Sequence, residues 1–371
     1  MKKLLLALLA VSGFSVAQAQ SSVTIYGLLD EGYSGISTRS GATKSQTNKF
    51  EQGVQSGSRL GFRGQEDLGN GTSAIFTIEM QLYPQDSTLS GSSNNGLFNR
   101  QSFVGVKQNG IGQATLGTQY TPMFNAVAIT DPGMVNNALG SVIYPANGSE
   151  VTTNAFTVRA SNALAFQTES FKGFRLGGLY SANNKDQTQT DVNTGGNTNI
   201  NGYGLNADYT YNKFFATLAY QSFRNETTSS ATATPVASQN NNGTNVTSGE
   251  TYVGATYDFG ILKAYAQYVN RKATSVLDSN AYLKRSGQQV GVRGFFTPRV
   301  EGWASVGNGK YTAYGAGSPT ANFVGYQLGT NYWLSKRTNL YGIVGNVYTT
   351  SEGSATSAGA NQYAMGVRHT F

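Results

Sequence analysis

The chain ends on the stretch YAMGVRHTF, residues 363–371. Tyr363, Met365, Val367, His369 and Phe371 occupy alternate positions, and small or polar residues stand between them. Because successive side chains of a β-strand point to opposite faces, this pattern predicts a strand with one apolar and one polar face. A terminal phenylalanine is a poor end for a water-soluble domain. The stretch therefore favours a strand whose apolar face lies in lipid.

Length and composition exclude several classes of protein. Glycine accounts for 46 of 371 residues, and only 12% of the residues are charged, against usual values of about 7% and about 25%. No apolar run of ~20 residues follows the first few positions, so a helical membrane protein is excluded. The absence of cysteine excludes disulfides and cysteine-bound zinc. The 22 tyrosines and 19 phenylalanines argue against a disordered chain. A large β protein remains.

The N-terminus has the three parts of a secretory signal peptide, which we predict to span residues 1–19. Lys2 and Lys3 form the positive region, a short apolar run follows, and the A-x-A cleavage motif lies at 17–19. We expect residues 20–371 to form one domain. Export of a cysteine-free chain fits the periplasm or outer membrane of a Gram-negative cell.

The rest of the chain repeats the strand pattern. In Tyr203–Tyr209, for example, Tyr203, Leu205, Ala207 and Tyr209 alternate with glycine, asparagine and aspartate. We predict sixteen such segments, and they lie near 22–36, 56–68, 71–83, 98–108, 111–118, 154–168, 172–182, 201–211, 213–223, 250–258, 260–272, 281–296, 298–308, 321–334, 336–349 and 360–371.

Short and long connections alternate between these segments. Short connections such as Gly69-Asn70 predict antiparallel hairpins, whereas residues 37–55, 84–97, 119–153, 183–200 and 224–249 form long polar connections. This asymmetry and the even strand number are typical of a transmembrane β-barrel. A soluble β-sandwich is the alternative, but it has no need of tyrosine at strand ends. We therefore predict an all-β fold, a 16-stranded antiparallel transmembrane β-barrel that is wide enough for a water-filled lumen.

With these features in place, the sequence resembles the general trimeric porins of Gram-negative outer membranes, of the β-proteobacterial type. The matching motifs are SVTIYG (22–27), SRLGFRGQEDLGNG (58–71), NRQSFVG (99–105), TLGTQYTP (115–122) and GVRHTF (366–371). The resemblance implies a homotrimer in outer-membrane lipid and lipopolysaccharide that passes small hydrophilic solutes by passive diffusion. It also implies that the third long connection, residues 119–153, folds inward as a constriction loop. Phe371 would be the C-terminal signature for barrel assembly.

Charges at the narrowest point should set the selectivity of such a pore. In the family, basic residues on neighbouring strands face the constriction loop, and the matching residues here are Arg59, Arg100 and Arg159. The acidic residues of the loop are Asp131 and Glu150, of which Asp131 is the better candidate to face the arginines. The further pore-lining candidates are Arg63, Glu79, Asp131, Arg175, Lys263 and Arg293. An arginine that lies ~5 Å from a passing anion stabilises it by about 0.8 kcal/mol in water. Three such arginines therefore predict a preference for small anions.

Other functions find weaker support. The single histidine, His369, lies on the predicted outward face, so we predict no enzymatic site, no cofactor and no metal site. The positive charges are dispersed rather than striped, which argues against nucleic acid as a partner. A substrate-specific outer-membrane channel would need an aromatic track along the lumen, and a surface adhesin would use the long polar loops. Saturable flux would indicate the former, and a soluble monomer on membrane fractionation would indicate a secreted binding protein.

Overall fold

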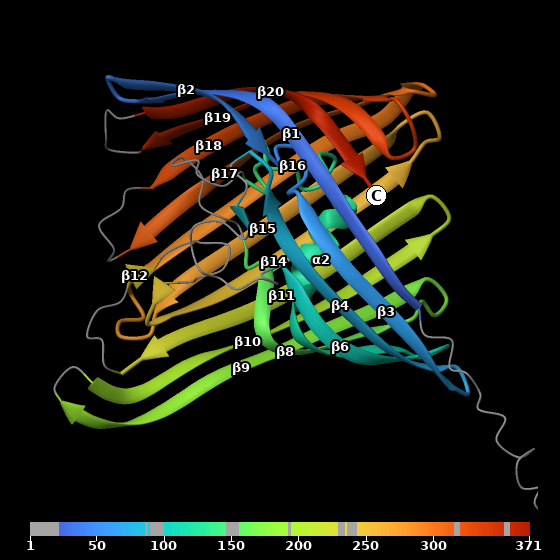
Figure 1. Ribbon diagram of the computed structural model, residues 1–371. Helices are drawn as coiled ribbons and strands as arrows, with labels where there is room; N and C mark the ends of the chain where they lie inside the picture. The colour runs from blue at the N-terminus through green and yellow to red at the C-terminus, as the bar shows by residue number, and fades with distance from the viewer. Residues whose placement is uncertain are drawn as a thin grey trace, which may run out of the picture.

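The chain forms a single β-barrel whose strands lie oblique to the barrel axis (Figure 1). The computed structural model describes residues 22–85, 88–89, 100–145, 156–191, 194–228, 234–235, 243–314, 320–351 and 357–371. The predicted signal peptide, residues 1–19, and Glu150 lie outside the described residues.

Sixteen strands form the wall, as the sequence predicts. They are β1 (Ser22–Ser40), β3 (Arg59–Gly69), β4 (Thr72–Tyr83), β6 (Gln101–Gln108), β7 (Gly112–Tyr120), β8 (Arg159–Thr168), β9 (Phe174–Asp191), β10 (Thr194–Tyr211), β11 (Phe214–Thr227), β14 (Val246–Asp258), β15 (Lys263–Ser275), β16 (Tyr282–Thr297), β17 (Val300–Tyr314), β18 (Ala321–Trp333), β19 (Thr338–Ser351) and β20 (Ser357–Thr370). Among the described residues, the remaining elements are β2 (Thr43–Gln52), β5 (Thr88–Leu89), β12 (Thr234–Pro235), β13 (Gly243–Thr244) and one helix, α2 (Pro122–Thr130).

The first and last strands close the barrel. β1 pairs antiparallel with β20 from Leu28 to Ser40, and its first half, Ser22–Leu28, pairs with β3 on the other side. Phe371 extends the closing contact, because it exchanges two backbone hydrogen bonds with Gly27. A Cβ added to Gly27 would lie 2.3 Å from the Phe371 ring. The absence of a side chain at Gly27 therefore lets the terminal ring lie across this seam.

The second half of β1 has a different partner. It pairs with β2 from Glu31 to Ser40, on the side opposite β20. We predicted residues 37–55 as a long polar connection, but Thr43–Gln52 of this stretch form β2, whose sequence TKSQTNKFEQ lacks an apolar face. Most of β2 is exposed, so backbone pairing holds the strand without burial of one face.

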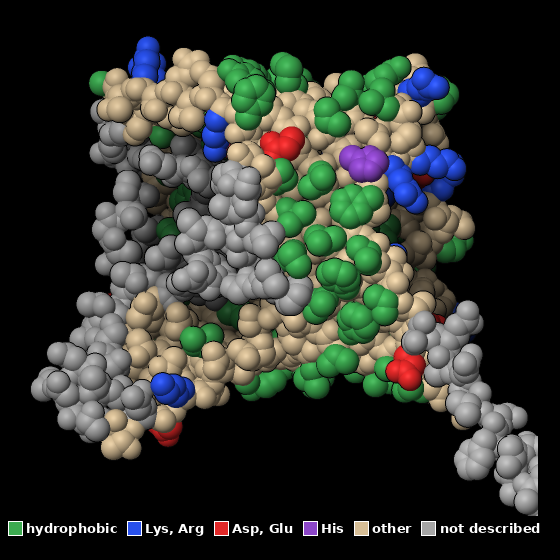
Figure 2. Space-filling view, in the orientation of Figure 1, with side chains coloured by type: hydrophobic (Ala, Val, Ile, Leu, Met, Phe, Trp, Pro, Cys, Tyr) green, Lys and Arg blue, Asp and Glu red, His purple; other side chains and the backbone are tan. Residues whose placement is uncertain are grey.

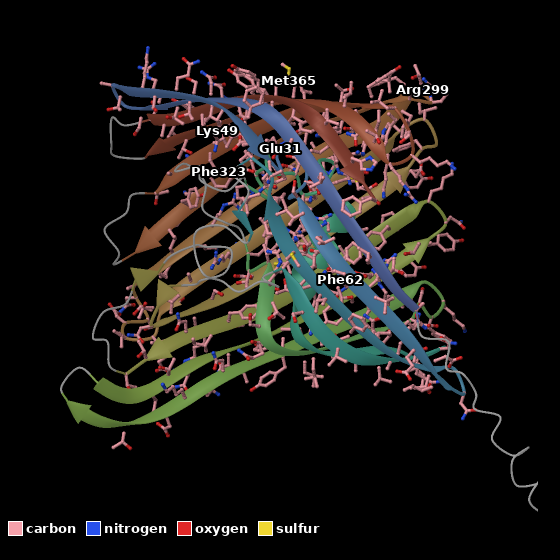
Figure 3. The ribbon with its side chains drawn as sticks, in the orientation of Figure 1. Glu31, Lys49, Phe62, Arg299, Phe323 and Met365 are labelled. Carbon is pink, nitrogen blue, oxygen red and sulfur yellow. The ribbon has the colours of Figure 1, made fainter. Side chains whose placement is uncertain are left out.

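The two ends of the barrel differ as predicted. Tight turns join β3 to β4, β6 to β7 and β16 to β17, and the C-terminus lies at the same end (Figure 1). The outer face of the wall is apolar and the inner face is polar. In β20, for example, Met365 is 58% exposed on the outside, whereas Gln362 is 6% exposed on the inside. Figure 3 shows Met365 pointing away from the barrel. In Figure 2, hydrophobic side chains cover the middle of the visible outer face.

The third loop lies between β7 and β8, and its described residues, 121–145 and 156–158, fold into the barrel as predicted. Met123, Val127, Val142 and Ile143 are each 0% exposed and pack against inner-wall side chains such as Phe323. The apolar character of this loop is thus explained by burial against the wall.

Helix α2 opens the third loop, and we did not predict it from the sequence. Thr121 caps the helix, because its side chain accepts a hydrogen bond from the backbone N–H of Phe124. Pro122 follows at the first helical position, where its fixed φ and missing N–H cost nothing. No helix among the described residues is long and apolar enough to span a bilayer.

Candidate functional site

The barrel encloses a cavity of about 2100 Å³ between the wall and the third loop. Positive side chains predominate among the charged residues that line it. The cations are Arg39, Lys49, Arg59, Arg63, Arg100, Arg159, Arg224, Arg293 and Arg368, and the anions are Glu51, Glu79 and Glu301. The field in this lumen is therefore positive.

Arg100 and Arg59 meet at one carboxylate on the inner wall. Glu79 of β4 accepts a hydrogen bond from Arg100 Nε at 2.6 Å, and its second oxygen lies 3.8 Å from Arg59 Nε. The Tyr26 hydroxyl donates to the same oxygen at 3.1 Å. Only 4% of Glu79 is exposed. One shared carboxylate thus compensates part of the charge of two guanidinium groups.

Tyr120, the last residue of β7, links Arg100 to Arg159. Its hydroxyl accepts from Arg100 Nη2 at 2.9 Å and from Arg159 Nη2 at 3.1 Å. The Phe124 ring of α2 stacks on the Tyr120 ring at 4.3 Å, and the Arg159 guanidinium lies over the ring at 4.7 Å. The helix and the wall therefore hold these two arginines in place together. The structure brings Arg59, Arg100 and Arg159 into one basic cluster.

The secondary candidates divide into two groups. Arg63, Glu79 and Arg293 line the cavity, and Arg293 is also held by Glu301 at 2.6 Å. Arg175 and Lys263 are not among the cavity-lining residues. Arg175 pairs with the buried Asp208 at 2.6 Å, and the Lys263 ammonium lies over the Tyr265 ring. Alternation identifies the face of a strand but not the partner that a side chain finds there.

Asp131 was our candidate to oppose the arginines, and this placement is wrong. It is only 3% exposed and does not line the cavity, because the end of α2 is pressed against the wall. Its carboxylate accepts from the Val135 backbone N–H at 2.8 Å and from Gln289 Nε2 at 3.2 Å. Burial raises the pKa of Asp131 to about 6. Among the described residues of the third loop, 121–145 and 156–158, no other acidic or basic side chain occurs, so this part of the loop presents no charge to the arginines.

Glutamine and arginine side chains of the inner wall hold the loop backbone. Leu139 donates its N–H to Gln362 at 2.7 Å, and Val142 donates its N–H to Gln289 at 2.9 Å. Arg285 donates to the Val142 carbonyl at 2.6 Å. The loop is therefore docked on the inner wall at β16 and β20, and its helix α2 contacts the arginine cluster through the Phe124 and Tyr120 rings.

Sequence reasoning missed several cavity-lining charges. Arg368 lies between the outward-facing Val367 and His369, so alternation within the terminal strand already placed it on the inner face. The sequence carries no comparable signal for Lys49 and Glu51, because β2 has no apolar face. His369 is exposed on the outer face, as predicted, and its Nδ1 lies 2.8 Å from the Thr338 hydroxyl.

Comparisons with known proteins identify a family and full-length relatives. The family model for Gram-negative porins matches residues 5–352. An outer membrane porin protein of Bordetella pertussis is 28% identical over the whole of both chains. Outer membrane porin protein 32 of Delftia acidovorans is 27% identical and covers 92% of this chain and 88% of its own length. Full-length similarity of this kind extends over the wall strands and the constriction.

Solved structures share the fold. The anion-selective porin from Comamonas acidovorans superimposes with a TM-score of 0.71 at 21% identity, and the match covers 95% of this chain and 100% of that one. An OmpF structure of Salmonella typhi matches with a TM-score of 0.62 at 18% identity, covering 96% and 99%.

Proposed function

The chain belongs to the Gram-negative porin family, and from that premise we propose that it passes small anions in preference to cations. Its full-length relatives are outer membrane porins, so the barrel is a channel in that membrane. The observation that carries the proposal is the arginine cluster, Arg59, Arg100 and Arg159, which faces a loop whose described part presents no charge. An arginine cannot lose its charge at working pH, so the field is permanent.

The expected preference follows from the net charge of the cluster. Three arginines and Glu79 leave two positive charges. At ~5 Å and in water these stabilise an anion by about 1.7 kcal/mol. Screening over a Debye length of ~8 Å reduces this to about 0.9 kcal/mol. Because a cation is disfavoured equally, the anion-to-cation ratio should be roughly twentyfold.

A general pore suits the constriction better than a channel for one stacked substrate. A substrate-specific channel would offer free aromatic faces along the lumen. At the cluster, however, Phe124 covers one face of Tyr120 and Arg159 lies over the ring. Liposome swelling should therefore rise linearly with solute concentration, and saturation would contradict a general pore.

We infer that the outside of the barrel contacts two further copies of this chain, so that the protein is a homotrimer. OmpT of Vibrio cholerae, a solved structure of the same fold, is described in a trimer form.

We also infer that the outside of the barrel binds lipopolysaccharide. Lys272 pairs with Lys284 across β15 and β16, Lys310 lies one strand further, and all three are exposed. Among the described residues none of them forms a salt bridge, so phosphate groups of the outer leaflet fit this patch. A heat-sensitive, SDS-resistant oligomer that retains lipopolysaccharide would be expected.

The reversal potential of a planar bilayer in a KCl gradient tests the proposed selectivity. Replacement of Arg59, Arg100 and Arg159 by glutamine should lower the anion-to-cation ratio severalfold, because the cluster then keeps only the negative charge of Glu79. Arg299→Gln is the matched control, since Arg299 lies exposed in a short turn away from the cavity (Figure 3). An anion preference that is unchanged after the triple replacement, or one that falls as much in Arg299→Gln, would contradict the assignment.

A further inference from the structure

A second segment besides the third loop turns into the lumen. We call this segment, Gly53–Ser58 between β2 and β3, the strap. Val54 is 4% exposed and Ser58 is 0% exposed, although the strap leaves a hairpin that is mostly exposed. Gly53, Val54, Gln55, Ser56 and Gly57 all line the cavity. The strap is therefore part of the pore.

Asp30 of β1 forms hydrogen bonds with three residues of the strap. Its carboxylate accepts from the Ser56 N–H at 2.6 Å, and its backbone carbonyl accepts from the Gly53 N–H at 3.0 Å. The Ser58 hydroxyl accepts from the Asp30 N–H at 2.9 Å. Asp30 itself is 0% exposed. One buried residue thus contacts the strap at its start, middle and end.

Gln55 joins the strap to a distant part of the wall. Its Nε2 donates to Asn331 of β18 at 2.5 Å, and its Oε1 accepts from Asn339 of β19 at 2.9 Å. In the sheet, β20 and β1 separate β19 from β3, the strand that follows the strap. The strap therefore spans several strands across the inside of the barrel.

The strap also holds the tip of the third loop. Asn137 donates its backbone N–H to the Val54 carbonyl at 2.9 Å and its side-chain N–H to the Gly53 carbonyl at 2.6 Å. The Val54 side chain packs in one cluster with Ala138 and Trp303. Movement of the loop away from the wall would break these contacts.

Gly57 lies against the basic cluster. A Cβ at this position would lie 3.2 Å from Arg100 Nη1 and 2.9 Å from Gln81 Nε2. The Gly57 carbonyl lies 3.4 Å from Arg59 Nη1, which donates to it. Any side chain at residue 57 would therefore occupy space beside two arginines of the constriction.

We propose that the strap is a second constriction element, which fixes the third loop through Asn137 and sets through Gly57 how large an anion can pass the arginines. This inference rests on the proposed function, because it refines the same site. Residue 57 is then a size-determining position that the third loop alone does not supply.

Thiol modification tests the size-determining position, and the absence of cysteine from the chain makes the experiment clean. In Gly57→Cys trimers, the anionic sulfonatoethyl methanethiosulfonate should lower single-channel conductance at least about twofold and weaken the anion preference. A neutral reagent of similar size should lower the conductance alone. Ser45→Cys is the matched control, because Ser45 lines the same cavity near the tip of the β1–β2 hairpin. There both reagents should change the conductance little.

The outcomes separate this inference from the function on which it rests. If unmodified protein is anion-selective but modification of Gly57→Cys leaves conductance unchanged, the strap assignment is overturned and the pore assignment stands. If unmodified protein shows no anion preference, the proposed function itself fails. Should Gly57→Cys not assemble, Gln55→Cys replaces it with the same expected loss of conductance.

Release of the loop tests the second role of the strap. Asn137→Ala removes the side-chain bond to Gly53, so open-channel current noise should increase while the channel still forms. Asn308→Ala, which removes a bond to Gln288 on the outer face, is the control. Current as steady in Asn137→Ala as in this control would show that the strap does not hold the loop.

Discussion

Glu79→Gln should strengthen anion selectivity and weaken the barrel at the same time. Glu79 is the carboxylate that contacts the arginines of the cluster, at 2.6 Å from Arg100 Nε and 3.8 Å from Arg59 Nε. Its removal raises the net charge of the cluster from two to three. One further charge at ~5 Å is worth about 0.8 kcal/mol in water, or about 0.45 kcal/mol after screening. The anion-to-cation ratio should therefore rise roughly fourfold.

The cost in stability comes from the same contacts. Glutamine keeps one acceptor oxygen but loses a charge-assisted bond, which is worth about 1.5–3 kcal/mol. Arg59 and Arg100 would then repel each other without compensation. The temperature at which the oligomer dissociates in SDS should fall, even though the selectivity improves.

Asp208→Asn provides the control for Glu79→Gln. Asp208 is also buried and ion-paired, at 2.6 Å from Arg175, but neither residue lines the cavity. Its replacement should lower the dissociation temperature without changing the reversal potential. A Glu79→Gln channel whose anion preference is unchanged or smaller would refute the electrostatic reasoning.

Three further predictions concern single positions. Tyr120→Phe removes the hydroxyl that Arg100 and Arg159 share, so the anion preference should fall severalfold and the single-channel current should become noisier; an identical reversal potential would contradict this. Asp131 has its pKa raised to about 6 by burial, above the ~3.9 of an unfolded chain, so its contribution to stability is greatest below pH ~4 and is lost as pH rises through about 6. The dissociation temperature should therefore increase from pH 7 to pH 5 by a larger amount in the unmodified protein than in Asp131→Asn. Gly27→Val places a side chain where the Phe371 ring lies, so barrel assembly should be impaired, and a normal yield of heat-modifiable oligomer would count against the role of this seam.

The sequence was sufficient for features that lipid imposes along each strand. A strand with lipid on one side and water on the other must alternate, so YAMGVRHTF and fifteen similar segments predicted the wall strands and the outward face of Met365. Resemblance to the family assigned Arg59, Arg100 and Arg159 to the constriction and predicted the inward loop.

Features that depend on contacts between distant segments were out of reach. Asp131 lies in the loop that we expected to face the arginines, but its carboxylate is buried against Gln289, a residue 158 positions away. Arg175 faces inward and is held by Asp208. The strap has no periodic pattern, and its position depends on partners such as Asn331 and Asn137. The local sequence specifies which face of a strand each side chain occupies. The positions of Asp131, Arg175 and the strap depend instead on contacts that exist only in the closed barrel.

The reversal potential of unmodified protein in a KCl gradient, measured at low and high salt, tests the central claim most directly. The potential should have the sign of anion preference. It should shrink as the Debye length shortens from ~30 Å at 0.01 M to ~3 Å at 1 M, because screening weakens the field of the arginines. A potential with the sign of cation preference, or one close to zero at low salt, would contradict a pore governed by Arg59, Arg100 and Arg159.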